Sequence, residues 1–200
     1  GTKQTDLTPM PKVRVNLVDE LLDNPTDVLV EMNRRDSTVF DVYRVNVVTG
    51  DTTMIARNPG NITGWVPDHQ GRIRAALTTD GVNGTVLFRP TEADTFRVIA
   101  RTTYKDTFAP LFFTFDDKAL YASSNLGRDK TAIVLFDPAT GKEREVLFQH
   151  PEVDVDGMQY SRKRKVLTEI DYTTWKQQRK FLDPATQALY ASLEKRLPGK

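Results

Sequence analysis

The residue types that usually carry catalysis or metal binding occur in this chain, but not at the spacings that such sites require. The two histidines, His69 and His150, lie far apart in the sequence and both fall in predicted turns, so a shared metal or acid–base site is not expected. The chain contains no G-x-S-x-G nucleophile motif, HExxH zinc motif, P-loop or EF-hand loop. Because it contains no cysteine, disulfides, thiolate metal ligands and cysteine nucleophiles are excluded. We expect no catalytic residue, metal or cofactor in this chain.

Two groups of charged residues remain as candidates for binding. The acidic run EVDVDG at 152–157 could suggest calcium, but it lacks the spaced oxygen ligands of a known calcium loop. Hydrogen bonding between neighbouring repeats is therefore its favoured role. Two loops that follow Asn33 and Asn125 share a pattern of basic residues and Asp, and side chains in such loops often contact partners. The candidates for these contacts are Arg34, Arg35, Arg128 and Lys130. Salt bridges that shape the loops are the alternative.

These loops belong to a unit of β-strands that recurs about every 46 residues. Its start is recognisable at three points, Gly64-Trp65, Leu111-Phe112 and Gly157-Met158. Each start is followed by a polar turn and a second apolar strand. A period of this length built only from strands is typical of a β-propeller blade. The sequence therefore predicts an all-β fold, a partial β-propeller of about four blades of antiparallel strands.

The repeat suggests the domain organisation. Residues 1–12 are polar and contain two prolines, so we expect an N-terminal arm. A partial propeller over 13–200 follows. Its blades are expected at 13–58, 61–101, 108–149 and 154–183, with a closing helix at 184–197.

The closing helix replaces the fourth strand that the last blade would need. Asp183 can cap its N-terminus, and Pro184 suits the first helical position. The spacing i, i+4, i+8 gives the helix an amphipathic pattern. Its apolar face is predicted to consist of Leu189, Leu193 and Leu197.

Two further features recur with the period of the repeat. Gly50 and Gly141 lie two repeats apart in Thr-Gly hairpin turns, where a positive φ is required. Trp65, Phe112 and Met158 recur at equivalent positions. Their recurrence indicates core packing between blades rather than a ligand site.

Composition excludes several classes of partner. The net charge is +1, from 28 basic and 27 acidic residues, so a nucleic-acid partner is not expected. The basic run RKRK at 162–165 falls in a predicted turn, where a solvated loop is the favoured interpretation. No apolar stretch approaches the roughly 18 residues of a membrane span. No signal peptide is visible, but the first residue is Gly and not Met, which suggests a trimmed start. The sequence therefore does not decide between bacterial periplasm and cytoplasm.

Several segments closely resemble the propeller of bacterial serine peptidases of the prolyl oligopeptidase family, of the dipeptidyl aminopeptidase or acylaminoacyl-peptidase type. The resemblance covers nearly the whole chain from about residue 13 and is carried by scaffold segments. These are NRRD at 33–36, VFDVYRVN at 39–46, GRDKTAI at 127–133 and HPEVDVDG at 150–157. The closing segment at 181–199 is similar to a helix that those proteins carry between blades.

The resemblance implies a non-catalytic role for this chain. The catalytic Ser, Asp and His of the family lie on an α/β-hydrolase domain C-terminal to the propeller, and no position here matches them. In a full-length parent, the propeller would cap the active site and restrict access to short peptides. The implied partners are the hydrolase domain, the remaining blades of the parent chain and peptides.

A stand-alone TolB-like propeller that acts as a protein-binding or scaffold module is the alternative function. The parent reading frame distinguishes the two, because a downstream G-x-S-x-G motif supports the peptidase. In both cases an open array leaves strand edges and blade faces uncovered. We therefore expect a curved open array that self-associates, or paired copies that cover each other's faces. A strict monomer in light scattering at high concentration would contradict this expectation.

Overall fold

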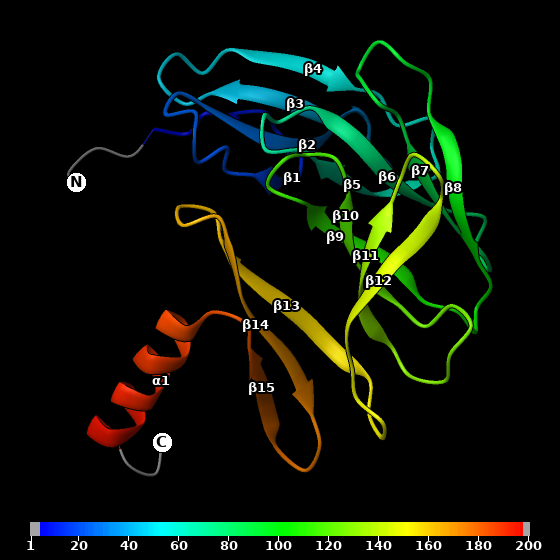
Figure 1. Cartoon of the computed structure of the whole chain (residues 1–200). Coiled ribbons are helices and arrows are strands. Elements are labelled where there is room, and N and C mark those ends of the chain that lie inside the picture. Colours follow the sequence, from blue (N-terminus) through cyan, green and yellow to red (C-terminus); the bar gives the residue numbers. More distant parts are fainter. Residues whose placement is uncertain (1–4, 198–200) are drawn as a thin grey trace. The chain divides into compact units, whose positions relative to one another are not determined.

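The structure, a computed structural model, describes residues 5–197. Within this range the chain forms fifteen β-strands in four antiparallel sheets, followed by one α-helix (Figure 1). In every sheet the strands are neighbours in chain order. The chain divides into two compact units, Gly1–Tyr104 and Lys105–Lys200, each of which contains two of the sheets. The predicted all-β class and the C-terminal helix are confirmed.

The first unit contains two four-stranded sheets. The strands of the first sheet are β1 (Val15–Asp19), β2 (Asp27–Asp36), β3 (Val39–Asn46) and β4 (Thr52–Ala56). The strands of the second sheet are β5 (Ile62–Pro67), β6 (Ile73–Thr79), β7 (Gly84–Phe88) and β8 (Arg97–Thr102).

An apolar core joins the two sheets of the first unit. Leu29 on β2 and Val42 on β3 are fully buried, and they belong to one cluster with Ile73 on β6. Trp65 packs against this cluster, as its recurrence in the sequence predicts. Since successive side chains of a strand point to opposite faces, Val30 belongs to a different cluster on the other face of the first sheet.

Part of the N-terminal arm covers that other face. Leu7 and Met10 pack against the cluster that contains Val30 and Met32. Both faces of β2 are therefore covered, which explains its nearly continuous apolar run. Residues 1–4 of the predicted arm lie outside the described residues.

The second unit contains one four-stranded and one three-stranded sheet. The four-stranded sheet comprises β9 (Phe108–Phe113), β10 (Leu120–Ser124), β11 (Ala132–Asp137) and β12 (Lys142–Gln149). The three-stranded sheet comprises β13 (Val155–Ser161), β14 (Val166–Thr173) and β15 (Gln177–Phe181). As the sequence predicts for the last repeat, this sheet has no fourth strand within the described residues.

The two sheets of the second unit share a core of their own. Ile133 on β11 and Ile170 on β14 are fully buried in one cluster with Met158 on β13, and Phe112 packs against it. The Phe112 ring also stacks on Tyr160, with 4.0 Å between centroids. The predicted role of Phe112 and Met158 in packing is confirmed.

Two hairpin turns repeat the same backbone conformation. Gly50 and Gly141 have φ values of 81° and 69°, in the left-handed region that glycine adopts without steric cost. Their backbone N–H groups donate to the carbonyls of Asn46 and Asp137, at 2.8 Å in both turns. The positive φ predicted from the Thr-Gly pattern is confirmed at both positions.

The C-terminal helix α1 spans Pro184–Arg196, with Asp183 as its N-cap and Leu197 as its C-cap. It is the only helix in the described range. With 13 residues and a polar composition, it is too short and too polar to cross a membrane. The face that packs on the sheet carries Thr186 and Tyr190. The remaining positions predicted to end the helix, 198 and 199, lie outside the described residues.

The apolar face that the sequence predicts for α1 does not cover the sheet. Its side chains are 58%, 43% and 52% exposed, at Leu189, Leu193 and Leu197 respectively. The reason is the direction of the N-terminal turn, where Arg164 binds both Asp183 and the hydroxyl of Thr186. These bonds direct the helix face that carries Thr186 toward the sheet, so the face that carries the leucines is largely exposed.

Candidate functional site

Arg35, at the end of β2, is bound to residues of its own unit. Its Nε and Nη2 donate to the two carboxylate oxygens of Asp41, each at 2.9 Å. Nη2 also donates to the backbone carbonyl of Asn58 at 2.8 Å. The hydrogen bond from Arg35 to Asp41 raises the pKa of the guanidinium. Arg35 therefore acts in the structure as a link between β2, β3 and the segment that leaves β4.

Arg128, in the second unit, is bound in a similar way. Its guanidinium forms an ion pair with Glu143 on β12, and its Nη1 donates to the carbonyl of Ser124 at 3.2 Å. The Ser124 hydroxyl donates to the other oxygen of Glu143 at 2.6 Å. Both carboxylate oxygens of Glu143 are thus occupied, and Arg128 fixes the loop between β10 and β11 to β12.

Arg34 and Lys130 make weaker contacts. Arg34 is exposed and donates to the Thr52 hydroxyl at 3.4 Å. Lys130 pairs with its neighbour Asp129 at 3.3 Å. Of the four basic candidates, these two have the side chains that are least committed to internal contacts. Whether any of the four contacts a partner stays a prediction.

The asparagines that precede the two basic pairs make equivalent hydrogen bonds. The side-chain oxygen of Asn33 accepts a hydrogen bond from the backbone N–H of Arg14 at 2.6 Å. The side-chain oxygen of Asn125 accepts one from the backbone N–H of Thr107, also at 2.6 Å. Asn33 therefore links β2 to the residue before β1, and Asn125 links the segment after β10 to the residue before β9.

The acidic run at 152–157 makes hydrogen bonds between the two sheets of the second unit. Asp154 accepts from the backbone N–H of Thr131 at 2.7 Å, and this bond lowers the pKa of the carboxyl. The backbone N–H of Val155 in turn donates to the carbonyl of Thr131 at 3.1 Å. The predicted role of this run in hydrogen bonding between neighbouring repeats is confirmed. No cluster of three or more His, Asp or Glu side chains suited to a metal occurs within residues 5–197.

A buried acidic pair on β14 is not among the sequence-predicted candidates. The side chains of Glu169 and Asp171 are 8% and 12% exposed, and Nε of Arg179 lies 3.5 Å from each carboxylate. The hydroxyl of Tyr190 on α1 donates to Glu169 at 3.3 Å. The sequence signal for this pair is the alternating TEID pattern at 168–171, which places both acidic side chains on one face of the strand. Because all these contacts are internal, the pair holds α1 and β15 against β14.

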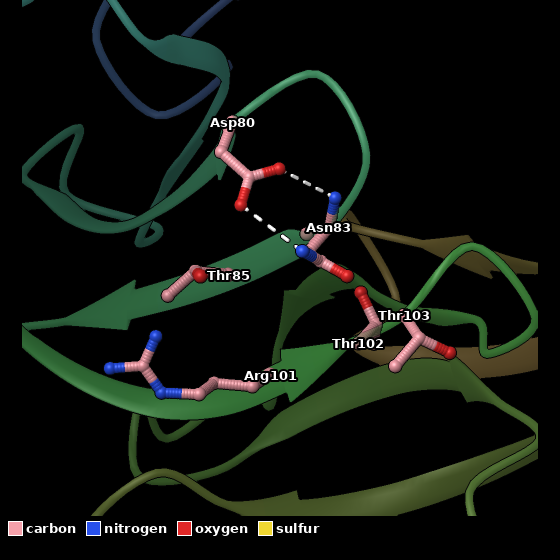
Figure 2. A pocket seen from close by; sticks show the side chains of 7 residues that line it. Asp80, Asn83, Thr85, Arg101, Thr102 and Thr103 are labelled. Atoms are coloured by element: carbon pink, nitrogen blue, oxygen red, sulfur yellow. Dashed lines mark hydrogen bonds between the residues drawn. The ribbon is translucent and has the colours of Figure 1, made fainter.

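A pocket of about 270 Å³ lies at one end of the β5–β8 sheet (Figure 2). It is formed by the turn between β6 and β7 and by the end of β8. Its lining residues are Asp80, Asn83, Gly84, Thr85, Arg101, Thr102 and Thr103. None of these residues belongs to a motif that the sequence marks as a site.

The turn beside the pocket is held by Asp80. Its carboxylate accepts hydrogen bonds from the backbone N–H groups of Val82 and Asn83, at 2.9 and 2.7 Å, and from the Asn83 side chain at 3.1 Å. These bonds, with that from the Asn83 backbone the largest contribution, lower the pKa of Asp80 to about 2. Asp80 is therefore ionised at neutral pH.

The chain is similar to part of a known peptidase. It is 27% identical over 196 residues to dipeptidyl aminopeptidase BIII of Pseudoxanthomonas mexicana. The match covers 97% of this chain but only 28% of that protein. The family resemblance found in the sequence is thus confirmed as similarity to a part of a dipeptidyl aminopeptidase.

Two other comparisons add no functional information. A chain from the crystal structure of mitotic checkpoint complex matches with a TM-score of 0.41 and 12% identity, over 92% of this chain and 69% of that chain. A similarity of this size does not establish a common fold. No protein-family model matches the sequence.

Proposed function

We infer that this chain is a non-catalytic, propeller-type part of a serine peptidase related to the dipeptidyl aminopeptidases. The observation that carries the proposal is the match along 97% of the chain to 28% of a dipeptidyl aminopeptidase. The sequence contains no G-x-S-x-G motif, so the peptidase chemistry would come from another part of the parent protein.

The organisation of the sheets supports this proposal. A propeller blade is a small antiparallel sheet whose strands follow one another in the chain, and each of the four sheets has this order. Neighbouring sheets of a propeller pack face to face through apolar side chains. Within each unit the two sheets share such an apolar cluster, around Ile73 in the first and Ile170 in the second.

In a full-length parent, the propeller would act by steric selection. It would cap the active site of an α/β-hydrolase domain and admit short peptides while excluding large folded proteins. Its partners would be that domain, further blades of the parent chain and the peptides themselves. Arg34, which is exposed near the end of β2, and Lys130, which is partly exposed in the loop between β10 and β11, would be available for contacts with these partners.

Kinetics of the parent protein test this function. The chain alone should give only background hydrolysis of dipeptidyl chromogenic substrates. The parent protein should hydrolyse them and should discriminate strongly against long peptides, and loss of the segment 13–200 should abolish that discrimination. Turnover by the chain alone, or a stop codon shortly after Lys200 in the natural reading frame, would contradict the proposal. The stop codon would favour a stand-alone TolB-like binding module instead.

A further inference from the structure

We propose that the pocket at the end of the β5–β8 sheet binds a carboxylate group, with Arg101 as its principal ligand and the Thr85 hydroxyl as a second donor. The carboxylate would belong to a small organic acid or to the C-terminus of a short peptide. This site lies within the first unit, and the proposal does not depend on the peptidase role.

Strand pairing brings the two donors together. Thr85 on β7 and Arg101 on β8 are direct partners in the antiparallel ladder, and directly paired residues project their side chains on the same face of a sheet. Thr85 also pairs with Thr78 on β6, so Asp80, two positions further along the chain, is expected on this face as well. Figure 2 shows the Thr85 and Arg101 side chains beside each other, with the Asp80 turn above them.

Arg101 has no internal partner within residues 5–197, whereas several other arginines of the first unit are paired. Arg44 pairs with Asp27, Arg72 with Asp68 and Arg89 with Glu92. Arg101 is exposed and forms no hydrogen bond or ion pair with any residue in the described range, and the same holds for the hydroxyl of Thr85. A guanidinium and a hydroxyl at one pocket wall are thus both free to donate.

The donor set and the size of the pocket favour a carboxylate. The planar guanidinium fork matches the two oxygens of a carboxylate with a pair of parallel hydrogen bonds. At about 270 Å³ the pocket is smaller than the usual site for a drug-sized molecule. It is suited to a small acid or to the terminal residue of a peptide.

Asp80 determines which anions the pocket accepts. Its carboxylate is engaged by three N–H donors of its own turn, and these bonds offset part of its charge. The remaining negative charge repels a doubly charged anion more than a singly charged one. We therefore expect a carboxylate to bind more tightly than inorganic phosphate at neutral pH.

The test uses the full chain, labelled with ¹⁵N, and an N-acetylated dipeptide in two forms. The form with a free C-terminal carboxylate should cause saturable amide shifts in residues 83–85 and 101–103, with a Kd of about 1 mM for a ligand of this size. The form with a C-terminal amide should cause none. Acetate should compete with the acid form, and inorganic phosphate should compete less well.

Variants identify the ligands of the carboxylate. Arg101→Gln should weaken binding by about tenfold or more, since charge-assisted pairs of hydrogen bonds are lost. Arg101→Lys should retain part of the affinity, and Thr85→Val should lose a few-fold with little change in side-chain shape. Arg57→Gln, which removes an exposed arginine at the end of β4, is the matched control and should bind normally.

Several outcomes would overturn the proposal. These are the absence of saturable shifts with the acid, equal binding of acid and amide, tighter binding of phosphate, and unchanged affinity in Arg101→Gln. The amide spectrum of each variant reports whether the sheet remains folded, so loss of binding through unfolding is distinguishable from loss of a ligand.

Discussion

The guanidinium of Arg35 binds both carboxylate oxygens of Asp41, whose side chain has no exposed area. Desolvation raises the pKa of Asp41, but the hydrogen bonds from Arg35 and from the backbone N–H of Asn58 outweigh it, so the pKa lies below its ordinary value. This pair joins β2 to β3, and through Asn58 it reaches the segment that leads to the second sheet. It is therefore a structural element of the first unit.

Removal of the Asp41 carboxylate should destabilise the first unit. In Asp41→Ala, the guanidinium of Arg35 and the N–H of Asn58 lose their acceptor. Breaking a buried pair by removing one partner costs about 3 kcal/mol of unfolding free energy. Urea unfolding, followed by tryptophan fluorescence of Trp65 in the first unit, measures the change.

Asp23→Ala is the control for this prediction, because Asp23 is exposed in the loop between β1 and β2. It should change the unfolding free energy by less than about 0.5 kcal/mol. Equal effects of the two substitutions would show that the Asp41 pair contributes nothing specific.

Gly71 should resist substitution more strongly than another glycine with a similar backbone. Gly71 and Gly50 have φ values of 73° and 81°, so alanine meets the same left-handed strain at both. A Cβ at Gly71 would lie 2.6 Å from a methyl carbon of the buried Leu21, whereas one at Gly50 meets nothing within 4 Å. Gly50→Ala should cost about 1 kcal/mol, and Gly71→Ala about 2 kcal/mol more. Chemical denaturation of the two variants provides the comparison, and equal losses would refute the role of the Leu21 contact.

The fold was largely predictable because its signals are local. Gly50 and Gly141 mark turns that require a positive φ, and Asp183 with Pro184 marks a helix start. Such positions depend on a few neighbouring residues, so a repeat makes them easy to recognise. The packing of Trp65 and Met158 was also visible, because equivalent positions recur with large apolar side chains.

The candidate site was less predictable because it depends on pairing. Arg35 and Arg101 are both arginines near strand ends, but of the two only Arg35 forms an ion pair within the described residues. That difference follows from which residues the strand register brings together. The leucines of α1 were expected on a packed face, yet the bonds of Arg164 at the helix start turn them outward.

The start of α1 should be sensitive to acid. Hydrogen bonds from the Thr186 hydroxyl, followed by those from Arg164, lower the pKa of Asp183 from 3.8 to about 2. A depressed folded-state pKa contributes stability above the unfolded-state pKa that is lost as the pH falls through the folded value. We expect amide protection at the start of α1 to be constant above about pH 5 and to decrease between about pH 4 and pH 2.

Asp183→Asn separates the cap from its charge. Asparagine is as good an N-cap as aspartate, so the helix should persist. Its amide protection should no longer decrease between about pH 4 and pH 2, because the titrating carboxyl is gone. Hydrogen exchange measured by NMR for residues 184–190 gives the answer site by site. An unchanged pH profile in Asp183→Asn would mean that another group is responsible.

Arg128 and Lys130 lie on either side of Asp129 in one loop, but the loss of each should affect a different property. Arg128 occupies both Glu143 and the carbonyl of Ser124, with its side chain only 17% exposed. Arg128→Gln should therefore lower the unfolding free energy of the second unit by about 1.5 kcal/mol. Lys130 pairs only with the exposed Asp129, and surface pairs of this kind contribute little. Lys130→Gln should leave stability unchanged within about 0.5 kcal/mol.

The proposed function allows a second comparison of the same two variants, in the full-length parent protein. If Lys130 contacts peptides or the catalytic domain, Lys130→Gln should raise KM or relax the length limit of the substrate while the unfolding midpoint stays constant. Arg128→Gln should instead lower the unfolding midpoint, and its kinetic defect should diminish at temperatures where the variant is fully folded. Normal kinetics in Lys130→Gln across peptides of different length would remove Lys130 from the proposed contacts. Because Lys130 pairs only with its exposed neighbour Asp129, its loss can change binding without changing the stability of its own sheet.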